Sequence, residues 1–197
     1  MSSTLQNLTP IQQKQALRQN LRLARKNLSP EARQRAEAAV RRQLLPLLKK
    51  GRRIGVYLAV GSELDLSSFI QSAQARGCQL YAPYIEAHSR RLWFTPLNPQ
   101  AKAQRLRPYG IAQYEGDKVR LSALDVVLLP LVGIDALGYR LGQGGGYYDT
   151  SLAACPAARR PKLIGVGFDV QRCEQVPTEP WDERLDAYLS ESGWLHF

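Results

Sequence analysis

The sequence predicts a single α/β domain, a three-layer sandwich in which a largely parallel central sheet is flanked by helices. Short apolar runs typical of buried strands recur along the 197 residues, and stretches with helix-start signals separate them. No Pro/Gly/Ser-rich linker divides the chain, so we expect one domain over residues 1–197. Ligands of such folds gather at the carboxyl ends of strands.

Two helices are predicted before the first strand. Residues 9–12 combine an N-cap threonine with a proline at the first helical position, and the helix should run to about Asn27. Residues 29–31 repeat this signal, and Pro46 should end the second helix near Leu45. Further along, we expect helices at 66–76 and 147–154 and strands at 53–59, 79–83, 91–95, 126–129 and 162–168.

The most informative stretch follows the strand at 126–129. Gly142, Gly144, Gly145 and Gly146 lack side chains that would keep a phosphate away from backbone N–H groups, and a helix start beyond them favours an anion. The stretch is neither a Rossmann G-x-G-x-x-G, because Tyr147 stands where glycine is needed, nor a Walker A loop. A glycine cluster taken alone is more often a flexible connection than a ligand site.

Positive charge is concentrated at the start of the chain. Residues 1–53 hold 13 Lys and Arg against 2 Asp and Glu, a net +11, whereas the whole chain has a net charge of +10. Lys14, Arg18, Arg22 and Arg25 recur at helical spacing and share one face of the predicted first helix. Composition alone favours a solvated face, with a nucleic-acid surface or a site for a small polyanion as alternatives.

Residues 138–149, read as Gly-x-Arg-Leu-Gly-x-Gly-x-Gly-Tyr-Tyr-Asp, resemble the signature of the 5-formyltetrahydrofolate cyclo-ligases, also called 5,10-methenyltetrahydrofolate synthetases. Lys14-Gln-Ala-Leu-Arg18 is similar to the Lys-x-x-x-Arg of that family's first helix, which contacts ATP. The loop that ends at Asp182 resembles the family's closing motif. The resemblance spans nearly the whole chain and implies the same three-layer α/β class.

The resemblance also implies roles for individual residues. Arg140 and Tyr147 are the expected catalytic residues, and Asp149 and Asp182 the expected Mg²⁺ ligands. The residues expected to bind ATP are Lys14, Arg18, Arg140, Leu141, Gly142, Gln143, Gly144, Gly145, Gly146, Tyr147 and Tyr148. The residues expected to bind the folate are Leu58, Glu63, Gln143, Gly144, Gly145, Gly146 and Tyr147.

Two of these assignments have plain structural alternatives. Glu63 could sit near the start of the next helix, where a negative charge is favourable, and Asp182 could be a turn residue that caps local backbone. Some relatives carry basic residues in place of Gln143 and Gly145, so phosphate charge should rest here on Lys14, Arg18, Arg140 and backbone N–H groups.

The implied reaction is the ATP- and Mg²⁺-dependent closure of 5-formyltetrahydrofolate to 5,10-methenyltetrahydrofolate, which releases ADP and phosphate through phosphorylation of the formyl oxygen. The alternatives are a basic nucleic-acid-binding protein without catalysis and a nucleotide-binding regulator that no longer turns over. The first explains the basic N-terminal helices but leaves the residues from Arg140 to Asp149 without a role.

Partners and compartment follow from composition. We expect a cytoplasmic monomer that acts on small molecules, with no nucleic-acid or membrane partner, because residues 1–9 lack the apolar core of a signal peptide and no apolar run is long enough to cross a bilayer. Cys78, Cys155 and Cys173 are odd in number and widely spaced, which suits reduced thiols.

Overall fold

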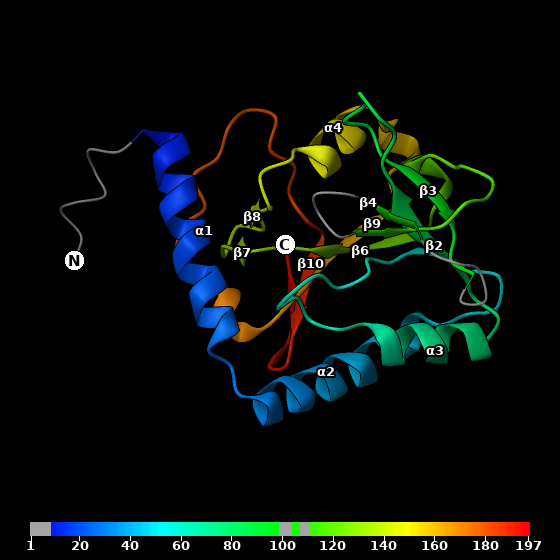
Figure 1. Cartoon of the computed structure of the whole chain (residues 1–197), viewed down its shortest axis with the longest axis horizontal. Helices are drawn as coiled ribbons and strands as arrows, with labels where there is room; N and C mark the ends of the chain where they lie inside the picture. The colour runs from blue at the N-terminus through cyan, green and yellow to red at the C-terminus, as the bar shows by residue number, and fades with distance from the viewer. Residues whose placement is uncertain (1–8, 99–103, 107–110) are drawn as a thin grey trace.

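The computed structural model describes residues 9–98, 104–106 and 111–197. Its centre is a seven-stranded sheet in the order β11-β10-β9-β6-β1-β2-β3 (Figure 1). The neighbours from β10 to β2 pair in parallel, and β11 and β3 are antiparallel edges. The strands are β1 (Arg53–Gly55), β2 (Gln79–Tyr84), β3 (Trp93–Pro96), β6 (Val126–Pro130), β9 (Lys162–Val166), β10 (Ala187–Ser190) and β11 (Gly193–His196).

Helices cover both faces of this sheet, which confirms the predicted α/β sandwich. α2 and α3 pack on one face, α4 packs on the other, and α1 lies at one end of the sheet beside the β7–β8 hairpin (Figure 1). The helices are α1 (Pro10–Lys26), α2 (Pro30–Leu44), α3 (Ser67–Ala75) and α4 (Tyr147–Ala153). None of the helices in the described ranges has both the length and the apolar character that a bilayer-spanning helix needs.

Short elements connect these layers. Four single turns of 3-10 helix are η1 (Leu45–Leu47), η2 (Leu121–Ala123), η3 (Ala157–Arg159) and η4 (Asp169–Gln171) within the described residues. Two small antiparallel hairpins pair β4 (Gln104–Leu106) with β5 (Ile111–Gln113) and β7 (Gly133–Ile134) with β8 (Arg140–Leu141).

The predicted helix starts are confirmed by their caps. Thr9 and Gln12 form a reciprocal capping box, in which the Thr9 side chain accepts from the Gln12 backbone N–H and the Gln12 side chain accepts from the Thr9 backbone N–H. The Ser29 hydroxyl accepts from the Ala32 N–H at 3.1 Å and caps α2. α2 ends at Leu44, and the proline that follows lies in η1, as a helix-breaking residue should.

Strand β6 is buried on both faces, as its continuous apolar run predicts. Val126 and Leu128 pack into the core under α2 and α3, and Val127 and Leu129 pack into the core under α4. This alternation places β6 in the middle of the sheet. The residues that follow it therefore emerge at the carboxyl edge, where ligands bind in folds of this class.

Some boundaries differ from the prediction. The strand predicted over 53–59 is regular only from Arg53 to Gly55, because its pairing with β6 stops at Gly55 and the chain then leaves the sheet toward α3. The strand predicted from residue 91 begins at Trp93. β10, β11 and the two hairpins were not predicted.

Candidate active site

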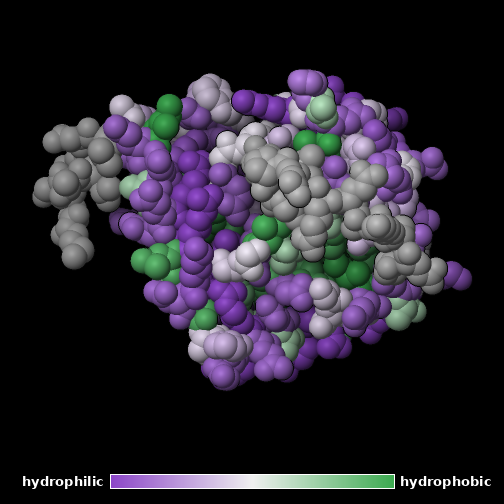
Figure 2. All heavy atoms as spheres, in the orientation of Figure 1, coloured by the Kyte–Doolittle hydropathy of each residue, from purple (hydrophilic) through white to green (hydrophobic). Residues whose placement is uncertain are grey.

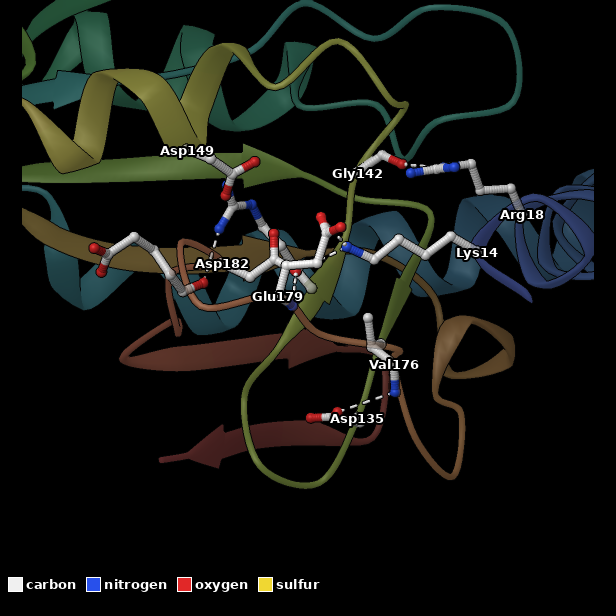
Figure 3. Close-up of polar contacts among 10 residues, drawn as sticks. Lys14, Arg18, Asp135, Gly142, Asp149, Val176, Glu179 and Asp182 are labelled. Carbon is white, nitrogen blue, oxygen red and sulfur yellow. Dashed lines mark hydrogen bonds and ion pairs between the residues drawn. The ribbon is translucent and has the colours of Figure 1, made fainter. Parts of the chain in front are cut away.

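The basic face of α1 points into the protein rather than into solvent. The Lys14 ammonium lies 2.8 Å from Asp182 Oδ2 and 3.3 Å from Glu179 Oε2 (Figure 3). Arg18 Nε donates to the Gly142 carbonyl at 2.9 Å. For these residues the interpretation as a solvated face is wrong, although the visible surface of this side of the molecule is largely hydrophilic (Figure 2).

Arg22 and Arg25 continue the same face. Arg22 Nη2 donates to Gln143 Oε1 at 2.6 Å. Arg25 is only 4% exposed; its Nε donates to Ser62 Oγ at 3.0 Å and its Nη1 to the Leu131 carbonyl at 3.3 Å. These contacts attach α1 to the loops that follow β1 and β6, so the helix forms one wall of a site at the carboxyl edge.

Cations are crowded along this wall. Burial, followed by the charge of Arg22, lowers the pKa of Arg18 from its usual value, and Asp182 only partly opposes this effect. The acceptors that Arg18 and Arg22 use are neutral, a backbone carbonyl and an amide side chain. Among the described residues, therefore, no carboxylate in direct contact cancels their positive charge.

The glycine loop needs glycine at two positions for conformational reasons. Gly144 has φ +107° and Gly146 has φ +68°, a region of backbone space that other residues rarely adopt. At Gly145 a Cβ would lie 2.8 Å from the Tyr147 ring, so this ring folds back over the loop. The loop passes directly into α4 at Tyr147, as predicted.

Arg140 and Asp149 form a second largely buried ion pair of the site. Arg140 Nη2 lies 2.5 Å from Asp149 Oδ1, and its Nη1 donates to the Glu183 carbonyl at 2.9 Å. The Arg140 side chain is 4% exposed and the Asp149 side chain 29%. Arg140 therefore connects the start of α4 to the loop that carries Asp182.

Asp135 helps to hold in place the segment that leads to Asp182. It is 3% exposed; its Oδ1 accepts from the N–H groups of Leu137 and Tyr139, and its Oδ2 accepts from the Val176 N–H at 3.1 Å (Figure 3). These bonds connect the β7–β8 hairpin to the chain that leads to Asp182. The sequence showed Asp135 close to the glycines but did not reveal this role.

Each of the two expected metal ligands retains one carboxylate oxygen that has no protein donor among the described residues. Asp149 Oδ1 is bound by Arg140, and Asp182 Oδ2 by Lys14 and by the Glu179 N–H at 2.9 Å, which leaves Asp149 Oδ2 and Asp182 Oδ1. No group of three or more His, Cys, Asp and Glu side chains with metal-site spacing occurs in the described ranges. Two hard oxygen donors fit Mg²⁺, which usually takes one or two carboxylates together with substrate phosphates and water.

Among the expected folate residues, Glu63 contacts the glycine loop directly. Glu63 Oε1 accepts from Gln143 Nε2 at 2.9 Å, and its Oε2 accepts from the Val60 N–H at 2.9 Å. Leu58 is half-buried on the same loop as Glu63. Burial, followed by the charge of Glu63, raises the pKa of Tyr148 above its usual value, so this phenol stays neutral beside the carboxylate.

Leu141 differs from its neighbours in the loop. Its side chain is 1% exposed and packs with Leu21 and Val132, and its carbonyl accepts from the Val132 N–H at 2.7 Å. A contact between Leu141 and ATP would therefore have to use its backbone N–H. Sequence analysis also missed Glu179, whose position three residues before Asp182 is its only signal.

Comparison with known proteins agrees with this geometry. Residues 10–191 match the 5-formyltetrahydrofolate cyclo-ligase family. The chain is 32% identical over 177 residues to the 5-formyltetrahydrofolate cyclo-ligase of Escherichia coli K12, covering 87% of this chain and 97% of that protein. It is 28% identical over 191 residues to the mouse cyclo-ligase, covering 91% and 94%.

A solved structure gives the same result. The NMR structure of Aquifex aeolicus 5,10-methenyltetrahydrofolate synthetase superposes with a TM-score of 0.78 at 28% identity, covering 93% of this chain and 92% of that one. Family match, relatives and fold therefore agree over most of both chains. The chain belongs to the 5-formyltetrahydrofolate cyclo-ligase family.

Proposed function

We propose that this protein closes 5-formyltetrahydrofolate to 5,10-methenyltetrahydrofolate at the expense of ATP, with Mg²⁺, and releases ADP and phosphate. The observation that carries the proposal is the convergence of Lys14, Arg18 and Arg22 of α1 on the glycine loop and on Asp182. Family membership indicates the reaction class. In this geometry the cationic side chains of α1 contact the glycine-rich loop, an arrangement that suits a triphosphate.

The chemistry explains why a triphosphate is needed. A formamide oxygen is a poor leaving group. In the proposed sequence this oxygen attacks the γ-phosphorus and ADP leaves. The folate N10 then adds to the resulting iminium carbon and loses its proton, and the former formyl oxygen departs as phosphate. No side-chain nucleophile is required, so the protein's tasks are positioning and neutralisation of charge.

The residues divide these tasks by position. In the proposed complex Arg18 and Lys14 contact phosphate oxygens, and the glycines at 142 and 144–146 offer backbone N–H groups that no side chain of their own shields. Arg140 holds Asp149 and, through the Glu183 carbonyl, the loop before β10, so its positive charge would lie close to phosphates bound between them. α4 has only seven residues, so the cations should carry most of the neutralisation.

Mg²⁺ would be held by Asp149 and Asp182, each through the oxygen that has no protein donor among the described residues. When bound, it neutralises phosphate charge and polarises the bond that breaks. Lys14 would then exchange its contact with Asp182 for one with phosphate.

The folate would lie against Glu63, Tyr147 and Leu58. A pterin presents neighbouring N–H donors on one edge, and a carboxylate accepts such a pair well. Glu63 is already oriented by Gln143 and by the Val60 N–H, and the Tyr147 ring over Gly145 is a flat surface beside the loop. The formyl group would then be directed toward the phosphate wall.

The nucleic-acid alternative loses its main support. Lys14, Arg18, Arg22 and Arg25 all contact acceptors of their own chain, so they do not form a free surface for a polyanion backbone. The family match and the relatives give it no support either.

The test is direct. Purified protein mixed with 5-formyltetrahydrofolate, ATP and Mg²⁺ should produce the absorbance of the methenyl product, and omission of ATP should abolish it. Protein that makes no methenyl product at any ATP concentration would refute the enzyme. If that protein still binds ATP, a regulator is indicated, whereas salt-steep binding to an oligonucleotide that ATP does not disturb would indicate the nucleic-acid alternative.

A further inference from the structure

A small basic pocket lies outside the residues assigned above to ATP, the folate or Mg²⁺. It has a volume of about 50 Å³, and its lining includes Arg91, Arg120, Ser122, Ser151 and Cys155. This is room for a carboxylate or phosphate group but not for a pterin or an adenine. We call it the Arg91–Arg120 pocket.

The two arginines that define this pocket have no carboxylate partner among the described residues. The nearby acid, Glu86, already uses Oε1 for Lys118 at 2.7 Å and Oε2 for the Trp93 indole N–H at 2.8 Å. Burial, and then the charge of Arg91, lower the pKa of Arg120, and Glu86 only partly opposes this. Two arginines that line one pocket without a carboxylate partner repel each other, and a bound anion would relieve this repulsion.

The pocket is also preformed. The Arg120 guanidinium lies 3.2 Å from the centroid of the Trp93 ring, which fixes its orientation. Burial raises the pKa of the Cys155 thiol, so that the thiol remains neutral and adds no competing negative charge. Arg91 is exposed at the surface, which leaves a path for a ligand to enter.

The position of the pocket connects it to the proposed folate site. Trp93 begins β3 and pairs with Tyr84, the last residue of β2, and β2 runs parallel to β1. The pocket therefore opens near the same edge of the sheet as the loop with Leu58 and Glu63. A direct link passes through Ser151, whose hydroxyl accepts from the Leu92 N–H at 2.8 Å and donates to the Tyr147 carbonyl at 2.6 Å.

We infer that the Arg91–Arg120 pocket binds a carboxylate of the glutamate portion of the folate substrate. This inference rests on the proposed function for the identity of the substrate. A folate is a long molecule with a pterin at one end and glutamate carboxylates at the other, separated by an aminobenzoyl spacer. With the pterin at Glu63 and Tyr147, the pocket lining runs along α4 from Ser151 to Ala154, four to seven residues or roughly 6–11 Å from Tyr147, a separation that the aminobenzoyl spacer can span.

The test compares two ligands that differ only in this end. Binding of 5-formyltetrahydrofolate and of the 5-formyltetrahydropteroyl amide, in which an amide replaces the glutamate and no carboxylate remains, is measured by calorimetry on the full-length protein without ATP. The wild type should bind the folate roughly tenfold more tightly, the value of one hydrogen bond between charged groups. Arg91→Ala and Arg120→Ala should each reduce this ratio toward one and leave the ATP KM unchanged.

Matched variants keep the result interpretable. Arg90→Ala removes an adjacent exposed arginine that does not line the pocket, and it should retain the wild-type ratio. Arg120→Lys keeps the positive charge but removes the guanidinium that lies over the Trp93 ring. Comparison with Arg120→Ala therefore separates the effect of the charge from the effect of the ring contact. A ratio that is the same in all variants and the wild type overturns the inference.

Two further outcomes distinguish the sources of the anion and the two proposals. If Arg120→Ala loses affinity for inorganic phosphate while the ratio of the two folates stays at its wild-type value, the pocket serves a free anion and the glutamate assignment is wrong. If the wild type binds both folates but forms no methenyl product, the proposed function fails, and the ratio still decides the role of the pocket.

Discussion

The Arg140–Asp149 pair allows catalysis and stability to be separated in one variant. Asp149→Asn keeps an oxygen acceptor for Arg140 Nη2, now 2.5 Å from Asp149 Oδ1, but removes the negative charge. The guanidinium remains 4% exposed with one bond to the Glu183 carbonyl. The change therefore leaves a buried cation without its counter-ion and removes an expected Mg²⁺ ligand.

The cost in stability follows from the exposure of the two partners. An exposed pair is worth about 1 kcal/mol or less, and loss of one partner from a fully buried pair costs about 3–5 kcal/mol. With Asp149 29% exposed, we expect about 2 kcal/mol. For a protein of this size that is a fall in Tm of roughly 4–8 °C. Since domains are typically stable by about 5–15 kcal/mol, well under a few per cent of the variant would be unfolded at 25 °C.

The effect on activity should be much larger than this. Loss of an Mg²⁺ ligand should lower kcat/KM by more than about 100-fold, or roughly 2.7 kcal/mol of activation free energy, and should raise the Mg²⁺ concentration needed for half-maximal rate. Asp182→Asn should do the same, and the double variant should lose less than the sum, because both act through one ion. The assay is the methenyl absorbance over an Mg²⁺ titration, with melting curves on the same samples.

The control is Asp169→Asn. The Asp169 side chain is 30% exposed and pairs with Arg172 at 3.3 Å, at a place that has no role in the proposed site. The Asp169→Asn variant should have a lower Tm but the kcat/KM and the Mg²⁺ titration of the wild type. If Asp149→Asn behaves like this control, with a lower Tm and an unchanged rate, then Asp149 is a structural partner of Arg140 and the metal assignment is wrong.

Four other results are expected. Lys14→Ala and Arg18→Ala should each raise the KM for ATP about tenfold or more, and more than that for the folate; an unchanged ATP dependence would make these contacts structural only. Gly144→Ala should lower turnover while circular dichroism stays native, because its φ of +107° strains any side chain; full activity would refute this.

Burial raises the pKa of Glu37, so the folded state disfavours its charge. That penalty is absent below the usual Glu pKa and appears as pH rises through the folded value, so Glu37→Gln should raise Tm at pH 7 and give no gain at pH 3. Burial, then Asp135, raises the pKa of Cys173 to about 11, so its alkylation, followed by peptide mass spectrometry, should speed up about tenfold per pH unit from 8 to 10.

The elements that were predicted well are those with a complete local signal. α1 and α2 begin at N-caps that are recognisable from four consecutive residues. The burial of β6 is recognisable from its uninterrupted apolar run. β10 and β11 have no such signal, because each has only four residues: β10 pairs with β9, more than 20 positions earlier, and β11 joins the sheet only through β10. The hairpin β7–β8 has two residues per strand and is defined by its partner alone.

The same distinction applies to the site. The glycine loop and the spacing of Lys14 and Arg18 are local patterns, so resemblance to the family could identify them. The contacts of Lys14 with Asp182 join residues 168 positions apart, and nothing in either local sequence indicates the partner. Arg25 looked like one more basic residue on a helix, yet its buried position depends on Ser62 and Leu131, which only the folded chain brings near.

The contacts of Lys14, Arg18 and Arg22 indicate how α1 would contribute to binding. Arg18 and Arg22 donate hydrogen bonds to neutral acceptors. Turning toward a phosphate would therefore break only hydrogen bonds to neutral groups and no ion pair. Lys14 forms ion pairs with two carboxylates. If its ammonium group moves to a phosphate, another cation must compensate the charge of Asp182. Asp149 and Asp182, when they hold Mg²⁺, would have positive charge beside the Asp182 carboxylate, so that Lys14 could turn to a phosphate without leaving that carboxylate unpaired. The contact between Lys14 and Asp182 thus joins the basic helix at the start of the chain to the family motif at its end.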